Sequence, residues 1–248
     1  MEKLVFFYSE GHKIFANIQI PRRGAPCILM SHGLESSKDG NKWRFLAPRF
    51  SEAGFATLRF SYRGCGEGNE KSEGRFEGTV LSARIKDYKT AIDYLGTTEG
   101  DVNRLGVIGS SFGGMTALAA KDRRVKAMVA LSTPSRLRPP TEGEIEAFRR
   151  RGYLELESGS RLVSDIYADA QKHNINIRED VKEIGCPLLV IHSRQDEVVP
   201  VGSAYELHNN AKEPKRLEII EGANHSFDAP EHVEQVAKLS LEWFKKYL

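Results

Sequence analysis

The chain has 248 residues, enough to bury a substantial hydrophobic core within one α/β domain. Its 36 lysines and arginines nearly balance its 34 aspartates and glutamates, so the formal charge is only +2. A nucleic-acid-binding face normally needs a basic excess, and this balance therefore argues against a nucleic-acid partner. No apolar run approaches the roughly 18 residues of a membrane span, so we expect no membrane partner.

The N-terminus lacks the apolar run and the small-residue cleavage site of a signal peptide. The three cysteines are far apart and odd in number, and they form neither a disulfide framework nor a metal-binding motif. These features predict a cytoplasmic protein without a metal site.

Apolar strand patterns alternate with helical patterns along most of the chain. We expect strands at residues 4–9, 15–20, 27–31, 56–62, 105–108, 125–131, 187–193 and 215–220. We expect helices at residues 43–53, 79–95, 115–120, 201–210 and 230–247. Such alternation predicts an α/β fold in which a mostly parallel, eight-stranded sheet carries helices on both faces.

The alternation breaks between residues 134 and 185, where Pro139-Pro140 is followed by charged helical patterns at 141–151 and 161–172. No strand is expected there before residue 187. About fifty residues are too many for a simple connection between two core strands. We therefore predict a core domain of residues 1–133 and 186–248, with a small helical cap insertion at 134–185 lying over the strand ends.

A serine turn lies where the strand at 105–108 meets the helix at 115–120. Residues 109–113 read Gly-Ser-Ser-Phe-Gly and fit G-x-S-x-G, with Ser111 at the centre. This motif describes a sharp strand-to-helix turn that exposes a nucleophilic serine above the sheet edge. Ser110 does not fit, because its own flanking residues are Ile108 and Phe112.

A serine nucleophile needs a base and a third group that orients the base. Asp196 and His225 each follow a predicted core strand, and the order Ser111, Asp196, His225 suits this type of fold. Taken singly, Asp196 could be a turn or N-cap residue and His225 a surface-loop residue; taken together after Ser111, they favour a triad. The acids and histidines that fit less well are Asp165, Asp169, Asp180, Glu197, His12, His173 and His192.

Acyl transfer also requires two donors directed at the developing oxyanion. We expect these to be the backbone N–H of Phe112, just after the nucleophile, and that of Leu34, in the loop after Ser31-His32-Gly33. His32 fits a structural hydrogen bonder better than a second base. The glycine-rich loop at 63–68 lacks the G-K-[ST] of a phosphate-binding loop, and Arg149-Arg150-Arg151 fits a solvated helix face.

Five segments carry a resemblance to the alpha/beta-hydrolase superfamily. They are Ser-His-Gly-Leu-Glu-Ser-Ser (31–37), Tyr-Arg-Gly-Cys-Gly-Glu-Gly (62–68), Gly-Ser-Ser-Phe-Gly-Gly (109–114), Ser-Arg-Gln-Asp-Glu-Val-Val-Pro (193–200) and Gly-Ala-Asn-His-Ser-Phe (222–227). Within the superfamily the chain is most similar to prokaryotic carboxylesterases of the cinnamoyl/feruloyl esterase type with a short cap. The resemblance implies the alpha/beta-hydrolase fold and a pocket shaped by the cap.

These features predict a serine carboxylesterase that hydrolyses a small-molecule ester through an acyl-enzyme, without metal or organic cofactor. The same triad acting on thioesters or peptides is the alternative, and a non-catalytic ligand-binding relative is a third reading. The substrate stays open, as does the oligomeric state, for which a homodimer is one option. Aromatic residues of the cap such as Tyr153 and Tyr167 fit packing better than lining of an acyl site.

Overall fold

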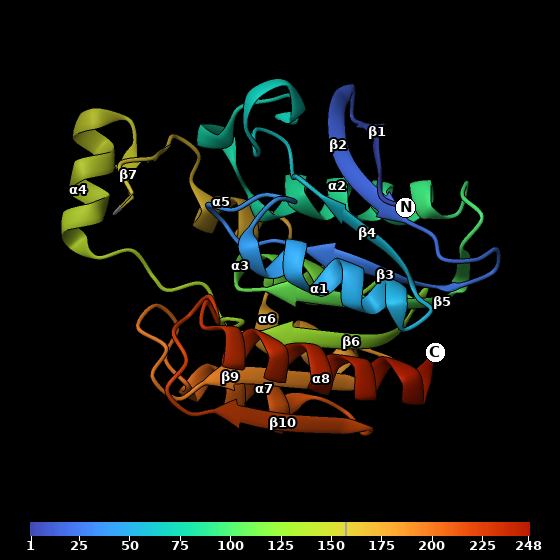
Figure 1. The fold of residues 1–248 in the computed structure, drawn as a ribbon. Helices are drawn as coiled ribbons and strands as arrows, with labels where there is room; N and C mark the ends of the chain where they lie inside the picture. Colours follow the sequence, from blue (N-terminus) through green and yellow to red (C-terminus); the bar gives the residue numbers. More distant parts are fainter. Residues whose placement is uncertain (157) are drawn as a thin grey trace.

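The computed structural model describes residues 1–156 and 158–248, and Glu157 lies outside the described part. Its centre is an eight-stranded sheet with the order β1-β2-β4-β3-β5-β6-β9-β10 (Figure 1). The strands are β1 (Lys3–Ser9), β2 (His12–Gln19), β3 (Pro26–Ser31), β4 (Ala56–Phe60), β5 (Asp101–Ser110), β6 (Val125–Leu131), β9 (Leu188–Ser193) and β10 (Lys215–Ile220). Pairs β1–β2 and β2–β4 are antiparallel, and the other pairs are parallel. The predicted mostly parallel, eight-stranded sheet is confirmed.

Helices cover both faces of this sheet, because successive side chains of a buried strand point to opposite faces. Ile28 of β3 packs into the core on one face, and its neighbour Leu29 packs into the core on the other. The helices of the first face are α1 (Asn41–Glu52) and α8 (Pro230–Tyr247), which lie side by side in Figure 1. Those of the second face are α2 (Leu81–Leu95), α3 (Phe112–Ala120), α6 (Ile177–Glu183) and α7 (Gly202–Asn210).

The apolar spacing of α1 and α8 explains both their extent and their position. In α1, Trp43, Leu46 and Phe50 recur at intervals of three or four residues and are buried. The chain leaves α1 at Gly54, whose φ of 97° is a conformation that glycine adopts at little cost. Helix α8 begins at Pro230, a position where the missing N–H costs no intrahelical hydrogen bond.

The segment expected to be purely helical contains a short hairpin as well. Strand β7 (Leu154–Glu155) pairs with β8 (Arg161–Leu162), so the expectation of no strand before residue 187 is wrong. The helix expected at 161–172 is shorter, since α5 (Ile166–Lys172) begins only after Asp165. The Asp165 carboxylate accepts the N–H groups of Tyr167 and Ala168 and thereby starts the helix there. Helix α4 (Glu142–Arg151) lies close to its expected place.

The division of the chain into a core and a cap at 134–185 stays a prediction. In Figure 1, α4 and β7 lie to one side, beyond the ends toward which the arrows of β6, β9 and β10 point. Helix α6, although inside the predicted insertion, packs against α3 and α7, with Ile177 and Val181 in the core of that face. The sequence pattern did not indicate α6.

The glycine-rich loop after β4 is used for close backbone packing. Gly64 has a φ of 73°, and a Cβ there would lie 2.2 Å from the backbone nitrogen of Phe76. The loop continues through two short 3-10 helices, η1 (Gly68–Glu70) and η2 (Phe76–Gly78). Across the described ranges, no helix combines the length and the apolar character needed to cross a bilayer.

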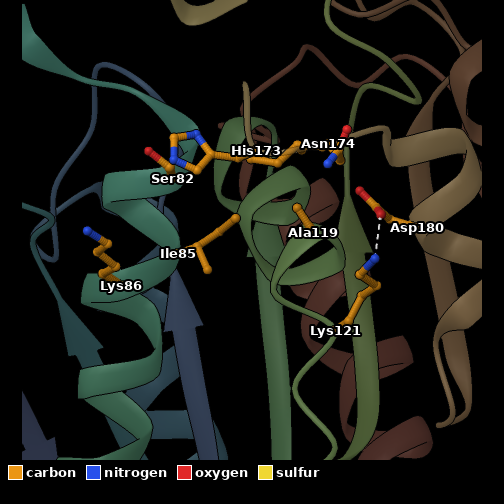
Figure 2. Close-up of a pocket in the computed structure, with 9 residues that line it drawn as sticks. Ser82, Ile85, Lys86, Ala119, Lys121, His173, Asn174 and Asp180 are labelled. Carbon is orange, nitrogen blue, oxygen red and sulfur yellow. Dashed lines mark ion pairs between the residues drawn. The ribbon is translucent and has the colours of Figure 1, made fainter. Parts of the chain in front are cut away.

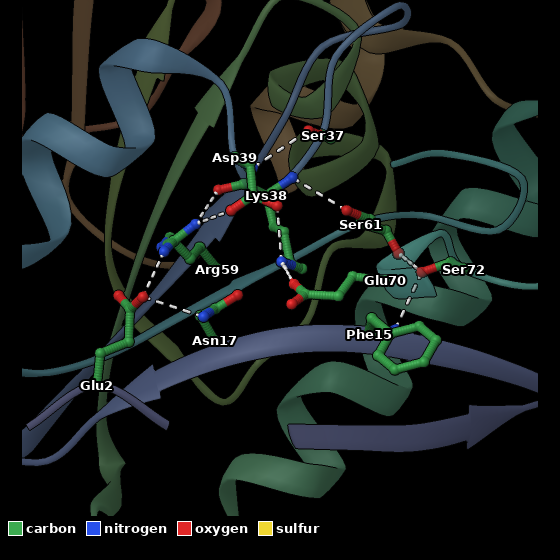
Figure 3. A network of polar contacts seen from close by, with 10 residues as sticks. All are labelled: Glu2, Phe15, Asn17, Ser37, Lys38, Asp39, Arg59, Ser61, Glu70 and Ser72. Atoms are coloured by element: carbon green, nitrogen blue, oxygen red, sulfur yellow. Dashed lines mark hydrogen bonds and ion pairs between the residues drawn. The ribbon is translucent and has the colours of Figure 1, made fainter. Parts of the chain in front are cut away.

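A network of charges holds the segment between β3 and α1 against the sheet (Figure 3). Lys38, almost fully buried, places its Nζ 2.7 Å from Asp39 and 2.5 Å from Glu70. The Arg59 guanidinium of β4 donates to the Lys38 carbonyl and to Asp39, each at 2.6 Å, and to Glu2 at 2.6 Å. The network therefore anchors the loop that follows Ser31-His32-Gly33.

Candidate active site

Ser111 occupies the turn between β5 and α3 in a strained backbone conformation. Its φ of 53° and ψ of −123° lie in a region that non-glycine residues rarely adopt. Two backbone hydrogen bonds hold this turn: the Ser111 N–H donates to the Leu131 carbonyl at 2.8 Å, and the Met115 N–H donates to the Ser111 carbonyl at 3.1 Å. The serine is thus fixed at the carboxyl end of a central strand.

The glycines of the motif are required by close backbone contacts. A Cβ at Gly113 would lie 2.3 Å from the Ser31 carbonyl oxygen at the end of β3. A Cβ at Gly109 would lie 2.8 Å from the Cα of Gly114. Both distances are impossible for a side chain without a shift of backbone, so the motif residues let β3, β5 and α3 approach one another directly around Ser111.

Asp196 and His225 meet at the ends of β9 and β10. The Nδ1 atom of His225 lies 2.8 Å and 2.9 Å from the two carboxylate oxygens of Asp196. Because an ionised carboxylate only accepts, Nδ1 carries the proton in the neutral imidazole, and Nε2 is left as an acceptor. This is the tautomer that a general base needs.

The surroundings of Asp196 keep its carboxylate ionised. Burial alone would raise the pKa of Asp196, but the hydrogen bond from His225 and those from the N–H groups of Val199 and Val198 hold the pKa below its usual range. These N–H groups donate to Oδ1 at 2.7 Å and 2.9 Å. Asp196 therefore fills both roles that the sequence allowed: it accepts hydrogen bonds from the turn that follows it, and it contacts His225.

His192, which the sequence ranked below His225 as a candidate base, contacts Asp196. Its Nε2 is 2.9 Å from the Val199 carbonyl oxygen and 3.4 Å from Asp196 Oδ2. A carbonyl oxygen only accepts, so Nε2 carries the proton, and burial lowers the pKa of His192, which favours the neutral ring. His192 thereby supports the loop that carries Asp196, a role that depends on tertiary contacts and leaves no local motif.

Ser111 lies on the same sheet edge without a direct hydrogen bond to His225 within residues 1–156 and 158–248. Lys42, in the first turn of α1, connects the two loops instead. Its Nζ donates to Ser110 Oγ at 2.7 Å and lies 5.7 Å from the centre of the Phe227 ring. Since Ser110 precedes Ser111 and Phe227 follows His225 by two residues, Lys42 links the serine turn to the histidine loop.

The two expected oxyanion donors lie next to the serine turn. The loop at Gly33 passes close to Ser111, because a Cβ at Gly33 would lie 3.5 Å from Ser111 Cβ. Phe112 is the first residue of α3, where N–H groups have no intrahelical partner. In the part of the chain that the structure describes, neither the Leu34 N–H nor the Phe112 N–H donates a backbone hydrogen bond. Both groups are therefore available to a ligand.

Two cavities lie among α2, α3, α5 and α6, and their linings do not include Ser111, Asp196 or His225. The larger, of about 540 Å³, is lined in part by Leu81, Arg136 and Tyr167. The smaller, of about 250 Å³, lies between α2 and the end of α3 (Figure 2). An ion pair of 2.9 Å between Lys121 and Asp180 forms part of its wall. Among the described residues, no group of three or more His, Cys, Asp or Glu side chains could hold a metal ion.

Comparisons with known proteins agree with this architecture. The putative esterase YitV of Bacillus subtilis (strain 168) is 27% identical over 241 residues, which cover 91% of each chain. An uncharacterized 31.7 kDa protein of Escherichia coli, from the traX-finO intergenic region, is 27% identical over 266 residues, covering 90% of this chain and 91% of that one.

Solved structures share the fold over nearly the whole chain. Est1E from Butyrivibrio proteoclasticus, with ferulic acid bound, superposes with a TM-score of 0.84 at 22% identity and covers 98% of both chains. The alpha/beta hydrolase GrgF from Penicillium sp. sh18 superposes with a TM-score of 0.80 at 21% identity, covering 100% of this chain and 99% of that one. The alpha/beta-hydrolase fold implied by the sequence resemblance is thus confirmed.

A family model, described as the prolyl oligopeptidase family (Peptidase_S9), matches residues 42–248. This span includes the serine turn, the Asp196 loop and the His225 loop. The chain therefore belongs to the prolyl oligopeptidase family and is a hydrolase with the alpha/beta-hydrolase fold.

Proposed function

We propose that the protein is a serine carboxylesterase in which Ser111 is the nucleophile, His225 the general base and Asp196 the group that orients the base. The contact of 2.8 Å between His225 and Asp196, at the edge of the sheet that also presents Ser111, carries this proposal. The relative named as a putative esterase and the fold shared with Est1E support it.

In the first step, His225 Nε2 takes the Ser111 proton while the hydroxyl oxygen attacks the ester carbonyl. The negative charge that develops on the carbonyl oxygen is stabilised by the N–H groups of Leu34 and Phe112. The tetrahedral intermediate then collapses, His225 protonates the leaving alcohol, and an acyl group remains on Ser111.

In the second step, His225 removes a proton from water as its oxygen attacks the acyl carbonyl. The bond between the acyl carbon and Ser111 Oγ then breaks, His225 returns the proton to Oγ, and the carboxylic acid leaves. Asp196 keeps the imidazole oriented in both steps and stabilises the imidazolium that forms. The reaction needs no metal or organic cofactor. The proposal includes a small-molecule ester as substrate, a cytoplasmic location, and neither a membrane nor a nucleic-acid partner.

A second candidate is a peptidase, which the description of the matched family favours. The same triad attacks an amide carbonyl by the same steps, but the leaving amine must be protonated more completely before it departs. Relative kcat/KM values on an ester, a thioester and an amide that share one acyl group separate these activities, and a thioesterase is the third outcome of that series.

We expect the wild-type protein to hydrolyse p-nitrophenyl esters from acetate upward, and Ser111→Ala to lose on the order of 10⁴-fold or more in kcat. The reason is that the nucleophile and its base act as one unit. The measurement is p-nitrophenolate release, with circular dichroism to show that the variant folds. The dependence on chain length also measures the size of the acyl site.

Ser110→Ala is the matched control, because it removes the neighbouring hydroxyl and leaves the nucleophile in place. We expect it to keep kcat within about tenfold, and to be labelled by a fluorophosphonate probe that leaves Ser111→Ala unlabelled. Equal activity in wild type and Ser111→Ala would contradict the triad. A wild-type protein that neither turns over esters nor reacts with the probe would point to a ligand-binding role.

A further inference from the structure

We propose that Arg84 is a positioning residue of the oxyanion hole: its guanidinium holds the Gly33 carbonyl, and this directs the Leu34 N–H toward the reacting oxygen. The inference rests on the proposed function and deepens it. It adds a buried residue on α2 to a reaction that the sequence assigns only to strand-end loops.

Arg84 is unusual among buried arginines because it has no carboxylate partner among the described residues. Its side chain is almost fully enclosed, yet no carboxylate lies within ion-pair distance in the described ranges 1–156 and 158–248. Arginine is seldom fully buried unless it is paired. Arg63, nearby, shows the usual arrangement, because it forms an ion pair of 2.6 Å with the buried Asp87. The groups in direct contact with the Arg84 guanidinium are therefore not carboxylates.

Carbonyls and aromatic rings surround the guanidinium. Its Nη2 donates to the His32 carbonyl at 2.5 Å and to the Gly33 carbonyl at 3.2 Å. Its central carbon lies 3.6 Å from the centre of the Tyr62 ring and 5.1 Å from that of Phe112. These contacts place the cation directly behind the loop that carries Leu34 and beside the residue that supplies the second donor.

The Gly33 carbonyl is held from a second direction by His32. The Tyr62 N–H donates to His32 Nε2 at 3.0 Å, so Nε2 is unprotonated and Nδ1 carries the proton. Nδ1 then donates to the Gly33 carbonyl at 2.7 Å. Burial and the Arg84 charge both lower the pKa of His32, which keeps the ring neutral and preserves this arrangement. Two donors thus fix one carbonyl oxygen.

Fixing this carbonyl also fixes the donor of the same peptide group. The Gly33–Leu34 peptide is planar, and in a trans peptide the C=O and N–H bonds point in opposite directions. With the oxygen held against Arg84 and His32, the Leu34 N–H points to the other side, where the loop passes Ser111. Donation to the carbonyl also polarises the peptide and makes its N–H a stronger donor.

The positive charge of Arg84 also stabilises the oxyanion, in addition to the positioning of the Leu34 N–H. Two of its nitrogens, Nε and Nη1, have no hydrogen-bond partner among the described residues, and the Asp87 carboxylate acts on the guanidinium only from beyond ion-pair distance. A cation in a low-dielectric site favours the appearance of negative charge nearby. The oxyanion supplies that charge only during the reaction, so the benefit belongs to the transition state and not to the bound substrate.

The test compares Arg84→Met and Arg84→Gln with the wild-type protein on p-nitrophenyl acetate. We expect kcat of Arg84→Met to fall about 10- to 100-fold with KM within about threefold, because loss of an oxyanion donor costs roughly 10²- to 10³-fold and misalignment costs less. Arg84→Gln keeps a neutral donor and should recover part of the loss. The rate of fluorophosphonate labelling and the affinity for an aryl trifluoromethyl ketone should fall by the same factor as kcat.

Arg63→Met is the matched control, since it removes a neighbouring arginine that has a carboxylate partner. We expect a lower midpoint of thermal unfolding for this variant, with kcat within about threefold of wild type below that midpoint. A folded Arg84→Met or Arg84→Gln with wild-type kcat overturns the inference. So does a loss of kcat that leaves the trifluoromethyl ketone affinity unchanged.

The inference and the proposed function fail in different ways. A wild-type protein without esterase activity, or an active Ser111→Ala variant, contradicts the proposed function. Esterase activity that requires Ser111 but is insensitive to Arg84 leaves the proposed function intact and contradicts only the positioning role. Where Arg84→Met does not fold, Arg84→Gln decides between these outcomes.

Discussion

Lys42 makes a hydrogen bond to Ser110, but burial removes much of the water that would otherwise solvate its ammonium group. Its ammonium group donates to Ser110 Oγ at 2.7 Å and is also close to the Trp43 and Phe227 rings. Burial lowers the pKa of Lys42 from 10.5 to about 8, and the more distant charges of Asp228 and Asp196 offset this only in part. The folded protein therefore holds the proton of Lys42 less tightly than the unfolded chain does.

This shift gives the contribution of Lys42 to stability a definite dependence on pH. Below pH 8 both states are protonated, and the folded state bears the full cost of the buried charge. Between pH 8 and 10.5 the unfolded chain keeps a proton that the folded protein has lost, so stability rises with pH. We expect Lys42→Met to be more stable than wild type at pH 7, with a difference that shrinks by pH 10. Urea unfolding of both proteins at several pH values measures the difference in their free energies of unfolding. A difference that does not change with pH would contradict the lowered pKa of Lys42.

The residues of the candidate site divide into those that a local pattern predicts and those that it does not. Ser111, Asp196 and His225 each stand in a turn after a core strand, and chain order alone relates them. Arg84 and Lys42 lie inside amphipathic helices, where the sequence shows only a charged residue. Their roles depend on which loop the helix packs against, and this is decided by tertiary structure.

At the scale of elements, α4 owes its stability to its ends and not to packing, because none of its residues is buried. Thr141 and Glu144 form a capping box, in which the Thr141 hydroxyl accepts the Glu144 N–H and the Glu144 carboxylate accepts the Thr141 N–H. Gly152, with a φ of 77°, ends the helix. Arg138 and the Thr141 N–H lower the pKa of Glu144 to about 2.

We expect Glu144→Ala to loosen α4 without lowering the stability of the whole protein. Loss of a cap costs about 1 kcal/mol, which corresponds to roughly fivefold faster hydrogen exchange in the helix. Hydrogen–deuterium exchange of residues 142–151 measures this, and the midpoint of thermal unfolding should stay unchanged. Glu146→Ala, an exposed change in the same helix, is the control. Equal exchange in both variants would show that the capping box does not hold α4.

The sequence predicts helices well where a long apolar stripe faces the sheet. Helices α1 and α8 lie close to their expected limits because their buried residues repeat at helical intervals over several turns. Helix α6 has only seven residues and β7 and β8 have two each, too few to establish a period. The start of α5 depends on the Asp165 cap, which an apolar pattern does not show.

At the scale of the whole molecule, the last helix, α8, packs directly against the central strand β5 at Gly106. A Cβ at Gly106 would lie 2.7 Å from Phe244 Cε1 and 2.8 Å from Leu248 Cδ1. Phe244 is fully buried against Phe50 and Phe55, so its ring has little room to move. The absence of a side chain at Gly106 therefore lets the last helix rest on the middle of the sheet.

We expect Gly106→Ala to destabilise the protein by about 1–3 kcal/mol, the usual cost of an overpacked core. The free energy of unfolding in urea measures the change. Gly185→Ala is the control, because a Cβ there would meet no atom within 4 Å and the residue has no positive φ. A Gly106→Ala variant as stable as the control would mean that α8 can shift on the sheet at no cost.

The backbone of Ser111 has a consequence for how this fold changes over evolutionary time. A residue held at a φ of 53° and ψ of −123° costs on the order of 1–3 kcal/mol, and glycine would relieve much of that cost. Selection for stability alone would thus favour losing the hydroxyl. On the proposed role of Ser111 as nucleophile, the strained serine is kept for turnover and not for stability, and a copy no longer selected for activity would gain stability by replacing Ser111 with glycine.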